Sequence, residues 1–225
     1  MNNCFSCFNW LSKVWRQKAA PGVGLAFVFL LASVPAFGQL TFAVNSLGDD
    51  GQEAASSGLF CFTGNIVPPQ VPECTLRAAI ESANDADEPV NIIFSQSIPT
   101  TNGNSQIGIE TGLPFIQNQV TIDGSTHPNY QGNGNVPLRI RYTGPSSSTV
   151  SGIRFSSNGG GSGSTVNAIG IVSFTGSGIL LNGGSGYMIS NNAIGIVWLG
   201  GGPTPAAESV VMALMSMVLP APVLR

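Results

Sequence analysis

Short runs of alternating apolar and polar residues extend from residue 40 to residue 197, and turn-forming residues separate almost all of them. Alternation with period two, carried by Val, Ile, Leu and Phe, is typical of strands that bury one face. Glycine and asparagine occupy the gaps, where turns need a positive φ. The pattern predicts an all-β chain with strands at Leu40–Asn45, Val90–Phe94, Ile107–Ile109, Val120–Ile122, Leu138–Tyr142, Gly152–Phe155, Ala168–Phe174, Gly178–Leu181, Tyr187–Ser190 and Ala193–Val197.

One segment has helical spacing instead. Thr75 is a good N-cap, and the apolar residues after it recur at three- and four-residue intervals (Leu76, Ala79, Ile80, Ala83). A helix is expected from about Leu76 to Asn84, ending before Pro89. Because so short a helix is not stable alone, its apolar stripe must lie on a hydrophobic surface. Residues 51–73, which contain three prolines, are expected to be irregular.

The chain repeats itself at a period of about 25 residues. Asn167–Val172 recurs letter for letter as Asn192–Val197, an offset of 25, and Ser151–Phe155 is echoed by Ser177–Leu181, an offset of 26. A fixed period of this size is the signature of a repeat architecture. Three predicted strands lie within one period, so the repeat unit is interpreted as one coil of a β-solenoid. A β-sandwich is the alternative, since it also has many short strands.

The repeat predicts which residues stack. At an offset of 25, Ile169 lies under Ile194, Ile171 under Ile196 and Asn167 under Asn192, with strands about 4.8 Å apart. The isoleucines would form an inner column, and the asparagines would form a hydrogen-bonded ladder at a corner. Residues 158–164, rich in glycine and serine, are expected to be a flexible loop.

The first 38 residues have the composition of a secretion signal. A basic stretch with Lys13, Arg16 and Lys18 precedes the apolar run Gly22–Val34, and small residues at Ala36 and Gly38 offer a cleavage site before Gln39. A membrane anchor is the alternative, but the run is shorter than the roughly 20 residues that a spanning helix needs. The chain is therefore expected to be exported, with no membrane span after signal removal.

Removal of residues 1–38 changes the charge and the cysteine content. Residues 39–225 contain no lysine, five arginines and all eleven acids, which gives a formal charge of −6. Such a chain is a poor nucleic-acid binder, because phosphate contacts need clustered cations. Cys61 and Cys74 remain as an even pair in an exported chain, and a disulfide is expected. Zinc is the competing interpretation, but one cysteine pair and the distant His127 do not make a ligand set.

The composition changes after Gly202. Residues 203–205 read Pro-Thr-Pro, and Ser209–Leu219 is rich in Val, Leu and Met. One interpretation is a helix that caps the open end of the solenoid. The other, which we favour, is that this atypical tail (201–225) does not belong to the fold, because the repeat stops abruptly.

The segment Cys74-Thr75-Leu76-Arg77-Ala78-Ala79-Ile80 resembles the signature of the bacterial CSLREA domain, Cys-Ser/Thr-Leu-Arg-Glu-Ala-Ile. The upstream segment Thr41–Ser46, the acidic Asp49-Asp50-Gly51 and Cys61 fit the same family. One departure is Ala78 in place of Glu, which removes the partner of a capping box and leaves the Thr75 cap alone. The resemblance implies an N-terminal capping region over residues 39–95, with the short helix as part of the cap.

Later elements, among them Val120–Thr126 and Asn191–Gly195, look like the right-handed parallel β-helix of pectin-lyase-like proteins. This resemblance implies that residues 96–200 form parallel β-helix coils. The expected fold is therefore all-β: a right-handed parallel β-helix, or solenoid, with a short N-terminal capping helix.

The pectin-lyase-like fold includes polysaccharide lyases and glycoside hydrolases, so the acids of the coils matter. Hydrolysis needs two carboxylates across the cleaved bond, and lyase chemistry needs a base and often Ca²⁺. Between residues 100 and 200 the acids are Glu110 and Asp123, half a coil apart, and they are not expected to share a face. His127 has no nucleophile or acid at a recognisable catalytic spacing. We therefore name no catalytic, metal or cofactor-binding residue and expect no cofactor; Asp49, Asp50 and Glu53 are interpreted as a solvated acidic turn rather than a Ca²⁺ site.

Four residues are candidate ligand contacts: Asp123, Arg139, Arg141 and Arg154. The arginines could hold an acidic glycan, although solvated outward arginines are the simpler interpretation. Asp123 precedes a glycine and is also expected to cap a turn.

The favoured function is an exported, non-catalytic β-helix module, adhesin-like or structural, secreted or on a bacterial surface. Its partner would be an extracellular polysaccharide or a cell-surface protein; the alternative is a lyase or hydrolase.

Overall fold

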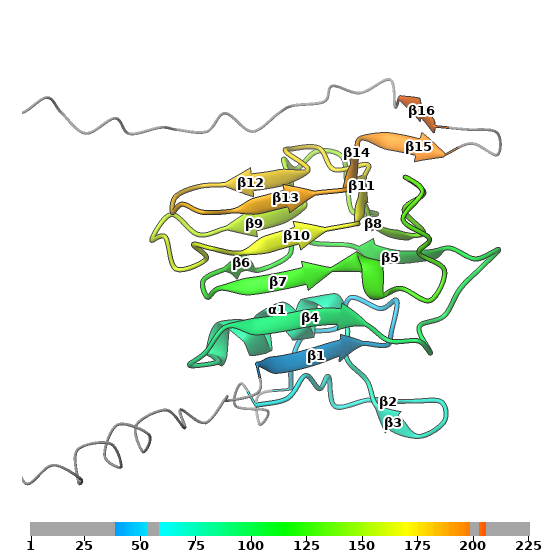
Figure 1. The fold of residues 1–225 in the computed structure, drawn as a ribbon, viewed down its shortest axis with the longest axis horizontal. Coiled ribbons are helices and arrows are strands. Elements are labelled where there is room, and N and C mark those ends of the chain that lie inside the picture. The colour runs from blue at the N-terminus through cyan, green and yellow to red at the C-terminus, as the bar shows by residue number, and fades with distance from the viewer. Residues whose placement is uncertain (1–38, 54–58, 199–202, 206–225) are drawn as a thin grey trace, which may run out of the picture. The chain divides into compact units, whose positions relative to one another are not determined.

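The computed structural model describes residues 39–53, 59–198 and 203–205. The predicted signal peptide and most of the atypical tail lie outside the described residues. Three parallel sheets of five, four and three strands make up most of the structure (Figure 1). The first sheet contains β1 (Leu40–Val44), β4 (Val90–Phe94), β7 (Val120–Asp123), β10 (Thr165–Asn167) and β13 (Met188–Ser190).

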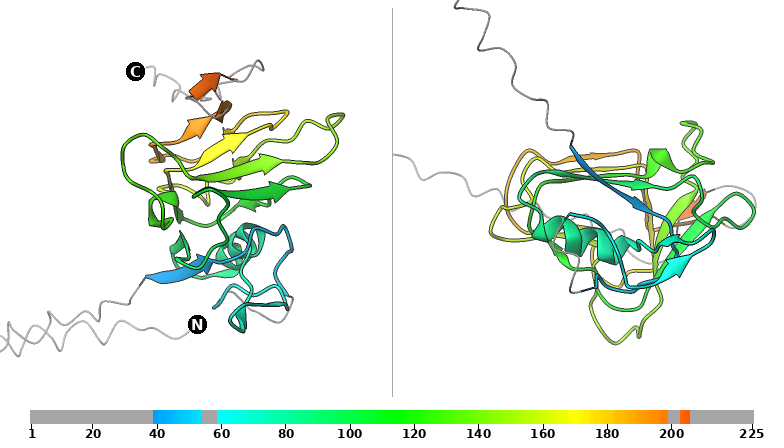
Figure 2. Two further views of the ribbon diagram at one scale, coloured as in Figure 1. Left: turned by 90° about the vertical axis from the view of Figure 1, so that its right-hand side faces the viewer. Right: turned by 90° about the horizontal axis from the view of Figure 1, so that it is seen from below.

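The second sheet contains β5 (Ser105–Ile109), β8 (Leu138–Tyr142), β11 (Gly170–Val172) and β14 (Ala193–Ile194), and the third contains β6 (Phe115–Ile116), β9 (Ile153–Phe155) and β12 (Ile179–Leu181). From β4 onwards the chain visits the first, second and third sheets in that fixed order. Successive visits add neighbouring parallel strands, so each set of three strands lies on the set before it (Figure 2). We call one such set a layer. The prediction of a β-rich chain with stacked parallel strands is confirmed.

Inward-facing aliphatic side chains align from layer to layer. Ile92, Ile122 and Val166 are neighbours in the first sheet, and Ile107, Ile140 and Ile171 are neighbours in the second. Five of these six side chains have no exposed surface, and Ile171 is 1 % exposed. Because every second residue of a strand points inward, each layer extends the same apolar interior.

The stacking register differs from the prediction by two residues. Ile171 pairs with Ile194 and Asn167 with Ser190, an offset of 23, whereas an offset of 25 was expected. The corner after the first sheet explains the difference. The chain turns there at Ala168 in one layer and at Asn191 in the next, with positive φ values of 57° and 55°, so equivalent residues are 23 apart. A shift of two keeps every inward-facing residue inward, so the apolar pattern alone does not distinguish the two registers.

The same corner divides two predicted strands. The run 168–174 was expected to be one strand, but the chain leaves the first sheet after Asn167 and enters the second at Gly170. The run 193–197 likewise divides at Gly195, whose φ is 69°, into β14 and β15 (Ile196–Trp198). β15 pairs antiparallel with β16 (Pro203–Pro205), so these tail residues do not continue the parallel stacking.

The helix α1 spans Leu76–Asp85, one residue longer than predicted. Thr75 Oγ1 accepts the Ala78 N–H at 3.0 Å and donates to the Asp50 carbonyl, so the predicted N-cap is confirmed. The stripe Leu76, Ala79, Ile80 and Ala83 is buried, and the helix contacts β1, β4 and the edge strand β6. Figure 2 shows α1 at the end of the layers where the chain begins its first strand.

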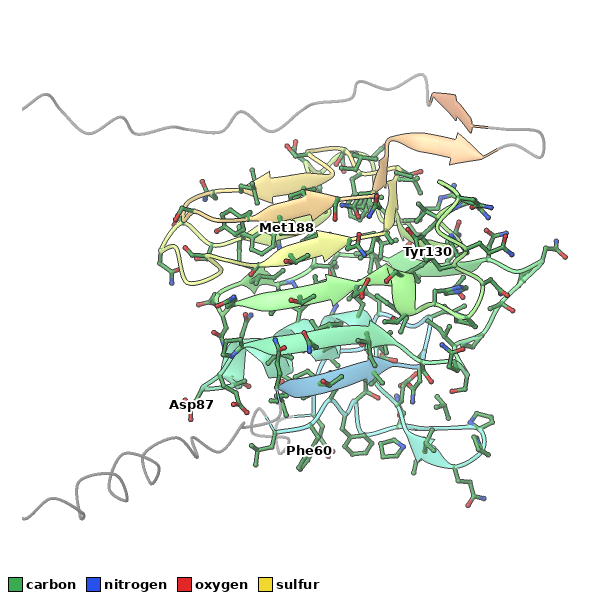
Figure 3. All side chains as sticks on the ribbon, viewed as in Figure 1. Phe60, Asp87, Tyr130 and Met188 are labelled. Atoms are coloured by element: carbon green, nitrogen blue, oxygen red, sulfur yellow. A yellow bond between two sulfur atoms is a disulfide. The ribbon has the colours of Figure 1, made fainter. Side chains whose placement is uncertain are left out.

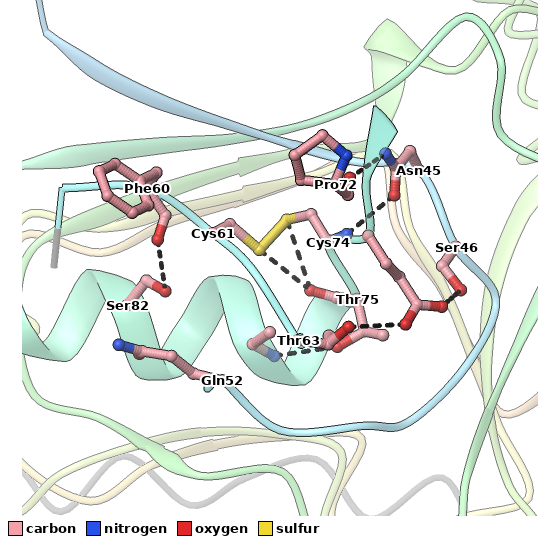
Figure 4. Close-up of a disulfide and its surroundings, with 12 residues drawn as sticks. Asn45, Ser46, Gln52, Phe60, Cys61, Thr63, Pro72, Cys74, Thr75 and Ser82 are labelled. Carbon is pink, nitrogen blue, oxygen red and sulfur yellow. Dashed lines mark hydrogen bonds between the residues drawn. A yellow bond between two sulfur atoms is a disulfide. The ribbon is translucent and has the colours of Figure 1, made fainter. Parts of the chain in front are cut away.

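The segment between β1 and α1 is not wholly irregular. β2 (Ile66–Val67) and β3 (Val71–Pro72) form a short antiparallel hairpin. Cys61 and Cys74 form the expected disulfide, with Cα atoms 5.3 Å apart (Figure 4). The two sulfurs are bonded to each other, which removes the zinc interpretation. The disulfide fastens the hairpin segment to the start of α1.

Residues 158–164 are not simply a flexible loop. Ser164 is fully buried, and its hydroxyl accepts the N–H of Val120, the first residue of β7, at 2.9 Å. Gly160 packs closely against the carbonyl of Gln117 in the neighbouring layer. Glycine is required here because a side chain would strike that carbonyl, so the composition reflects close packing between layers.

Candidate functional site

A buried carboxylate organises the capping region beside the disulfide. Glu73 is 8 % exposed and accepts hydrogen bonds from Ser46 Oγ at 2.5 Å, Thr63 Oγ1 at 2.7 Å and Asn65 Nδ2 at 3.0 Å. Burial acts to raise the pKa of Glu73, but the three hydrogen bonds outweigh it, and the pKa lies below its usual value. Figure 4 shows Ser46 and Thr63 on the two segments that this carboxylate joins. With its lone pairs engaged in this way, Glu73 has a structural role.

Arg77, in the first turn of α1, is also a structural residue. Arg77 makes an ion pair with Asp49 at 2.9 Å, and the two side chains are 12 % and 13 % exposed. It also donates to the carbonyls of Thr111 and Gly112, between β5 and β6. Asp49 therefore pairs with an arginine and accepts the Glu110 N–H at 3.0 Å. These hydrogen bonds and the ion pair join the capping region to the first layer.

An open depression of about 410 Å³ lies beside α1 and contains two carboxylates. Its lining consists of Gln52, Glu81, Asn84, Asp85, Pro114 and Gln117. Glu81 accepts the Gln52 N–H at 2.6 Å, and Asp85 accepts from Gln52 Nε2 at 3.4 Å. Since these groups hold one another, the depression is part of the cap rather than a site with free catalytic groups.

The acids of the layers do not meet. Glu110 follows β5 of the second sheet, whereas Asp123 ends β7 of the first sheet. Asp123 Oδ1 accepts the Ser125 N–H at 3.0 Å, the Ser125 hydroxyl at 2.6 Å and Asn167 Nδ2 at 2.9 Å. The expected turn cap at Asp123 is confirmed; its contact with a ligand stays a prediction.

The polar ladder at this corner has a different composition from the prediction. Asn167 Oδ1 accepts from Asn191 Nδ2 at 2.8 Å and from Ser190 Oγ at 3.0 Å, in place of the expected Asn192. Asn192 instead accepts the Ile169 N–H and donates to the Val166 carbonyl. The ladder Asp123–Asn167–Asn191 therefore follows the observed register of the strands.

Sequence reasoning missed a buried histidine–serine pair. His127 is 2 % exposed, and its Nε2 lies 2.8 Å from Ser105 Oγ. Asn129 N–H donates to His127 Nδ1 at 3.2 Å, so the proton of the neutral ring is on Nε2, and Ser105 in turn donates to the Pro99 carbonyl at 2.7 Å. Burial lowers the pKa of His127. In this arrangement the ring donates to the serine and cannot take its proton, so the pair is structural.

The candidate arginines lie on two different sheets. Arg139 and Arg141 point outward from β8 of the second sheet, and Arg154 lies on β9 of the third. Arg154 donates to the Leu113 carbonyl through Nε at 2.9 Å and lies over the Phe115 ring at 4.4 Å. Burial and the charge of Arg77 lower the pKa of Arg154. The structure therefore brings Arg139 and Arg141 together and gives Arg154 a separate, structural environment.

Arg77 and Arg154 make side-chain hydrogen bonds, but Arg139 and Arg141 make no side-chain hydrogen bond or ion pair in the described part of the chain. Arg139 is partly buried, and burial lowers its pKa, while Arg141 is exposed. Cationic groups without a partner among the described residues are candidates for ligand contact. We take this outward face of β8 as the candidate binding site.

Exposed apolar side chains gather in the capping region. Leu59, Phe60 and Ile66 are 67 %, 58 % and 63 % exposed, and Val71 is 36 % exposed. A hollow of about 360 Å³ is lined by residues 66–70 of the β2–β3 hairpin. Figure 3 shows Phe60 at the opposite end of the layers from Met188.

Two broader properties concern the described residues alone. No helix among them has the length and apolar character to cross a membrane. Within the same residues, no three side chains of His, Cys, Asp or Glu lie close enough together to hold a metal ion.

Comparison with known proteins gives no relative: no family model, no curated protein and no solved structure matches this chain.

Proposed function

We propose that this chain is an exported, non-catalytic module whose layers form a right-handed parallel β-helix, and that it acts by presenting its outer faces to extracellular partners. The observation that carries the proposal is the stacking itself. In the described part of the chain, twelve strands form three sheets of parallel strands, and the chain visits those sheets in a fixed order. Such stacking gives outward-facing side chains in regular rows on the faces of the module.

Support for export comes from the N-terminal segment and the disulfide. The basic and apolar segments before Gln39 are typical of a secretion signal. The Cys61–Cys74 disulfide suits an oxidising compartment. The resemblance of Cys74–Ile80 to the CSLREA signature supports a bacterial surface or secreted module with an N-terminal cap.

Support for a binding role over catalysis comes from the state of the polar groups. Glu81 and Asp85 are engaged with Gln52, and Asp123 is engaged with Ser125 and Asn167. The His127 ring donates to Ser105 instead of activating it. By contrast, Arg139 and Arg141 point outward with no partner among the described residues. A surface of this kind binds a partner without bond cleavage.

An assay for polysaccharide cleavage tests the proposal. The full chain is incubated with alginate, polygalacturonate and neutral glucans, and new reducing ends and unsaturated products are measured. We expect no product above background. Cleavage that disappears in Glu110→Ala/Asp123→Ala or in Glu81→Gln/Asp85→Asn would contradict the proposal and identify an enzyme.

A further inference from the structure

The outer face of the second sheet carries two arginines that have no partner among the described residues, and the inference drawn from them rests on the proposed binding function. Arg139 and Arg141 are separated by one residue on β8, so their Cα atoms lie about 6.6 Å apart on the same face. β8 is an inner strand, paired with β5 on one side and β11 on the other. The two arginines therefore extend from a strand that is hydrogen-bonded on both sides.

Each arginine has a glycine on one neighbouring strand, and Gln106 and Val172 lie on the other sides of Arg139 and Arg141. Gly170 pairs with Arg139, and Gly108 pairs with Arg141. A Cβ at Gly170 would lie 2.8 Å from Arg139 Cγ, closer than real contacts allow. The Arg139 side chain thus lies across the backbone of β11, in a position that glycine alone leaves open. Gly108 is partly exposed beside Arg141, and the side chain nearest to its Cβ position is that of Thr143, at 3.7 Å.

No acid among the described residues forms an ion pair with either arginine. Burial of a charge is costly unless the charge is paired, yet the partly buried Arg139 has no partner in the described residues. Glu110, which directly follows β5, forms no ion pair with Arg141, and its backbone N–H donates to Asp49. Residues 39–225 have a formal charge of −6, so general attraction to polyanions is not expected from net charge.

We propose that Arg139 and Arg141 bind successive anionic groups, carboxylates or sulfates, along an acidic polysaccharide. Guanidinium groups bind such anions through paired hydrogen bonds. Two guanidinium groups on the face of an inner strand suit the repeated anions of a polysaccharide, whereas a peptide usually needs an apolar pocket or a free strand edge. The backbone groups of β8 already bond to β5 and β11 and cannot pair with a peptide strand.

The test measures binding of the full chain to four immobilised polymers at low salt. Alginate carries carboxylates, dextran sulfate carries sulfates, dextran is neutral, and polyglutamate represents an acidic peptide. We expect alginate, dextran sulfate or both to bind, dextran not to bind, and the binding to weaken as salt is added. The choice between the first two polymers identifies the anion.

Two variants locate the site. Arg139→Gln/Arg141→Gln is expected to bind at least about tenfold more weakly, since it removes charge-assisted hydrogen bonds. Gly170→Ala retains both charges but displaces the Arg139 side chain, and several-fold weaker binding is expected. Thermal unfolding of each variant shows whether its fold is retained.

The matched control changes net charge by the same amount on other turns. Asn158→Asp/Asn182→Asp adds two negative charges on exposed turns between the third and first sheets, and it is expected to bind as the unaltered chain does. Equal loss in this control, equal binding by Arg139→Gln/Arg141→Gln or by Gly170→Ala, or preference for polyglutamate or dextran would overturn the inference. These outcomes are independent of the cleavage assay, which tests the proposed function.

Discussion

Single polar side chains fix the path of this chain where regular hydrogen bonding ends. The Glu73 carboxylate joins two segments of the capping region, and His127 connects the loop after β7 to the start of β5 through Ser105. None of these partners is predictable from the sequence, because the paired residues come from different segments and their spacing follows no local rule. Asp123 was predictable as a turn cap, because its partner Ser125 is two residues away.

Mild acid should destabilise the protein through His127. Burial lowers the pKa of this residue below 6.5 in the folded state, so the folded chain favours the neutral ring. Stability is then complete above the unfolded pKa of about 6.5 and decreases as pH falls towards the folded pKa. We expect the melting temperature to fall between pH 7.5 and pH 5.5.

His127 is the single histidine of the sequence, so this range isolates it from other side chains of ordinary pKa. His127→Gln should have a lower melting temperature at pH 7.5 but a smaller change between the two pH values. A change as large as that of the unaltered chain would mean that another group is responsible.

At the scale of elements, α1 takes the place of a strand next to β6. Asn84 Nδ2 donates to the Phe115 carbonyl at 2.8 Å, and its Oδ1 accepts the Gln117 N–H at 2.8 Å. The Asn84 side chain thus makes the two hydrogen bonds that a neighbouring strand would make to the free edge of β6. In the other direction, Asn118 Nδ2 donates to the Ala83 and Ala86 carbonyls at the end of the helix.

Asn84→Ala should therefore destabilise the chain although Asn84 is partly exposed. The change leaves the Phe115 carbonyl and the Gln117 N–H without partners, and we expect a loss of about 1–3 kcal/mol in the free energy of unfolding. Gln117→Ala is the control, since the Gln117 side chain is exposed and its backbone makes the bond. Urea unfolding measures both variants, and equal stabilities would refute this role of Asn84.

The helix and most strands were predictable because their apolar spacing is local. The limits of α1 differ by one residue from the expectation, and Val90–Phe94 and Leu138–Tyr142 are as expected. The corner at Ala168 was not predictable, because a positive φ at alanine is rare and leaves no mark in the sequence pattern. The two-residue error in register and the misplaced asparagine ladder both follow from that corner.

At the scale of the whole molecule, stability should depend on how many layers cover a residue. Ile140, Ile171 and Ile194 form one column of the second sheet; Ile140 is fully buried, whereas Ile194 in the last layer is partly exposed. Deletion of a covered side chain leaves a cavity that neighbours cannot fill.

Ile140→Ala should cost about 2–5 kcal/mol in the free energy of unfolding, and Ile194→Ala clearly less. The two variants make the same chemical change in the same column. The difference between their free energies of unfolding therefore measures the effect of the layer that covers Ile140. Denaturant unfolding followed by circular dichroism gives both values. A larger loss at Ile194 would show that residues outside the described part cover the last layer.

The candidate site was predictable in part. Two arginines separated by one residue on a strand must share a face, which the sequence shows directly. The position of Arg154 on another sheet depends on how the chain divides among the sheets, and so does the glycine that accommodates Arg139. The separation of Arg154 from the pair therefore needed the structure.

Disulfide trapping tests the stacked parallel layers most directly. Thr121 and Thr165 are paired neighbours on the outer face of the first sheet, and Thr165 in turn pairs with Met188. In a Cys4→Ser/Cys7→Ser background, mild oxidation should crosslink Thr121→Cys/Thr165→Cys nearly completely, as mass spectrometry of the peptides would show. Thr121→Cys/Met188→Cys should stay reduced, because these residues are two strand spacings, about 9.5 Å, apart. Failure of the first pair to crosslink, or ready crosslinking of the second, would contradict the stacking.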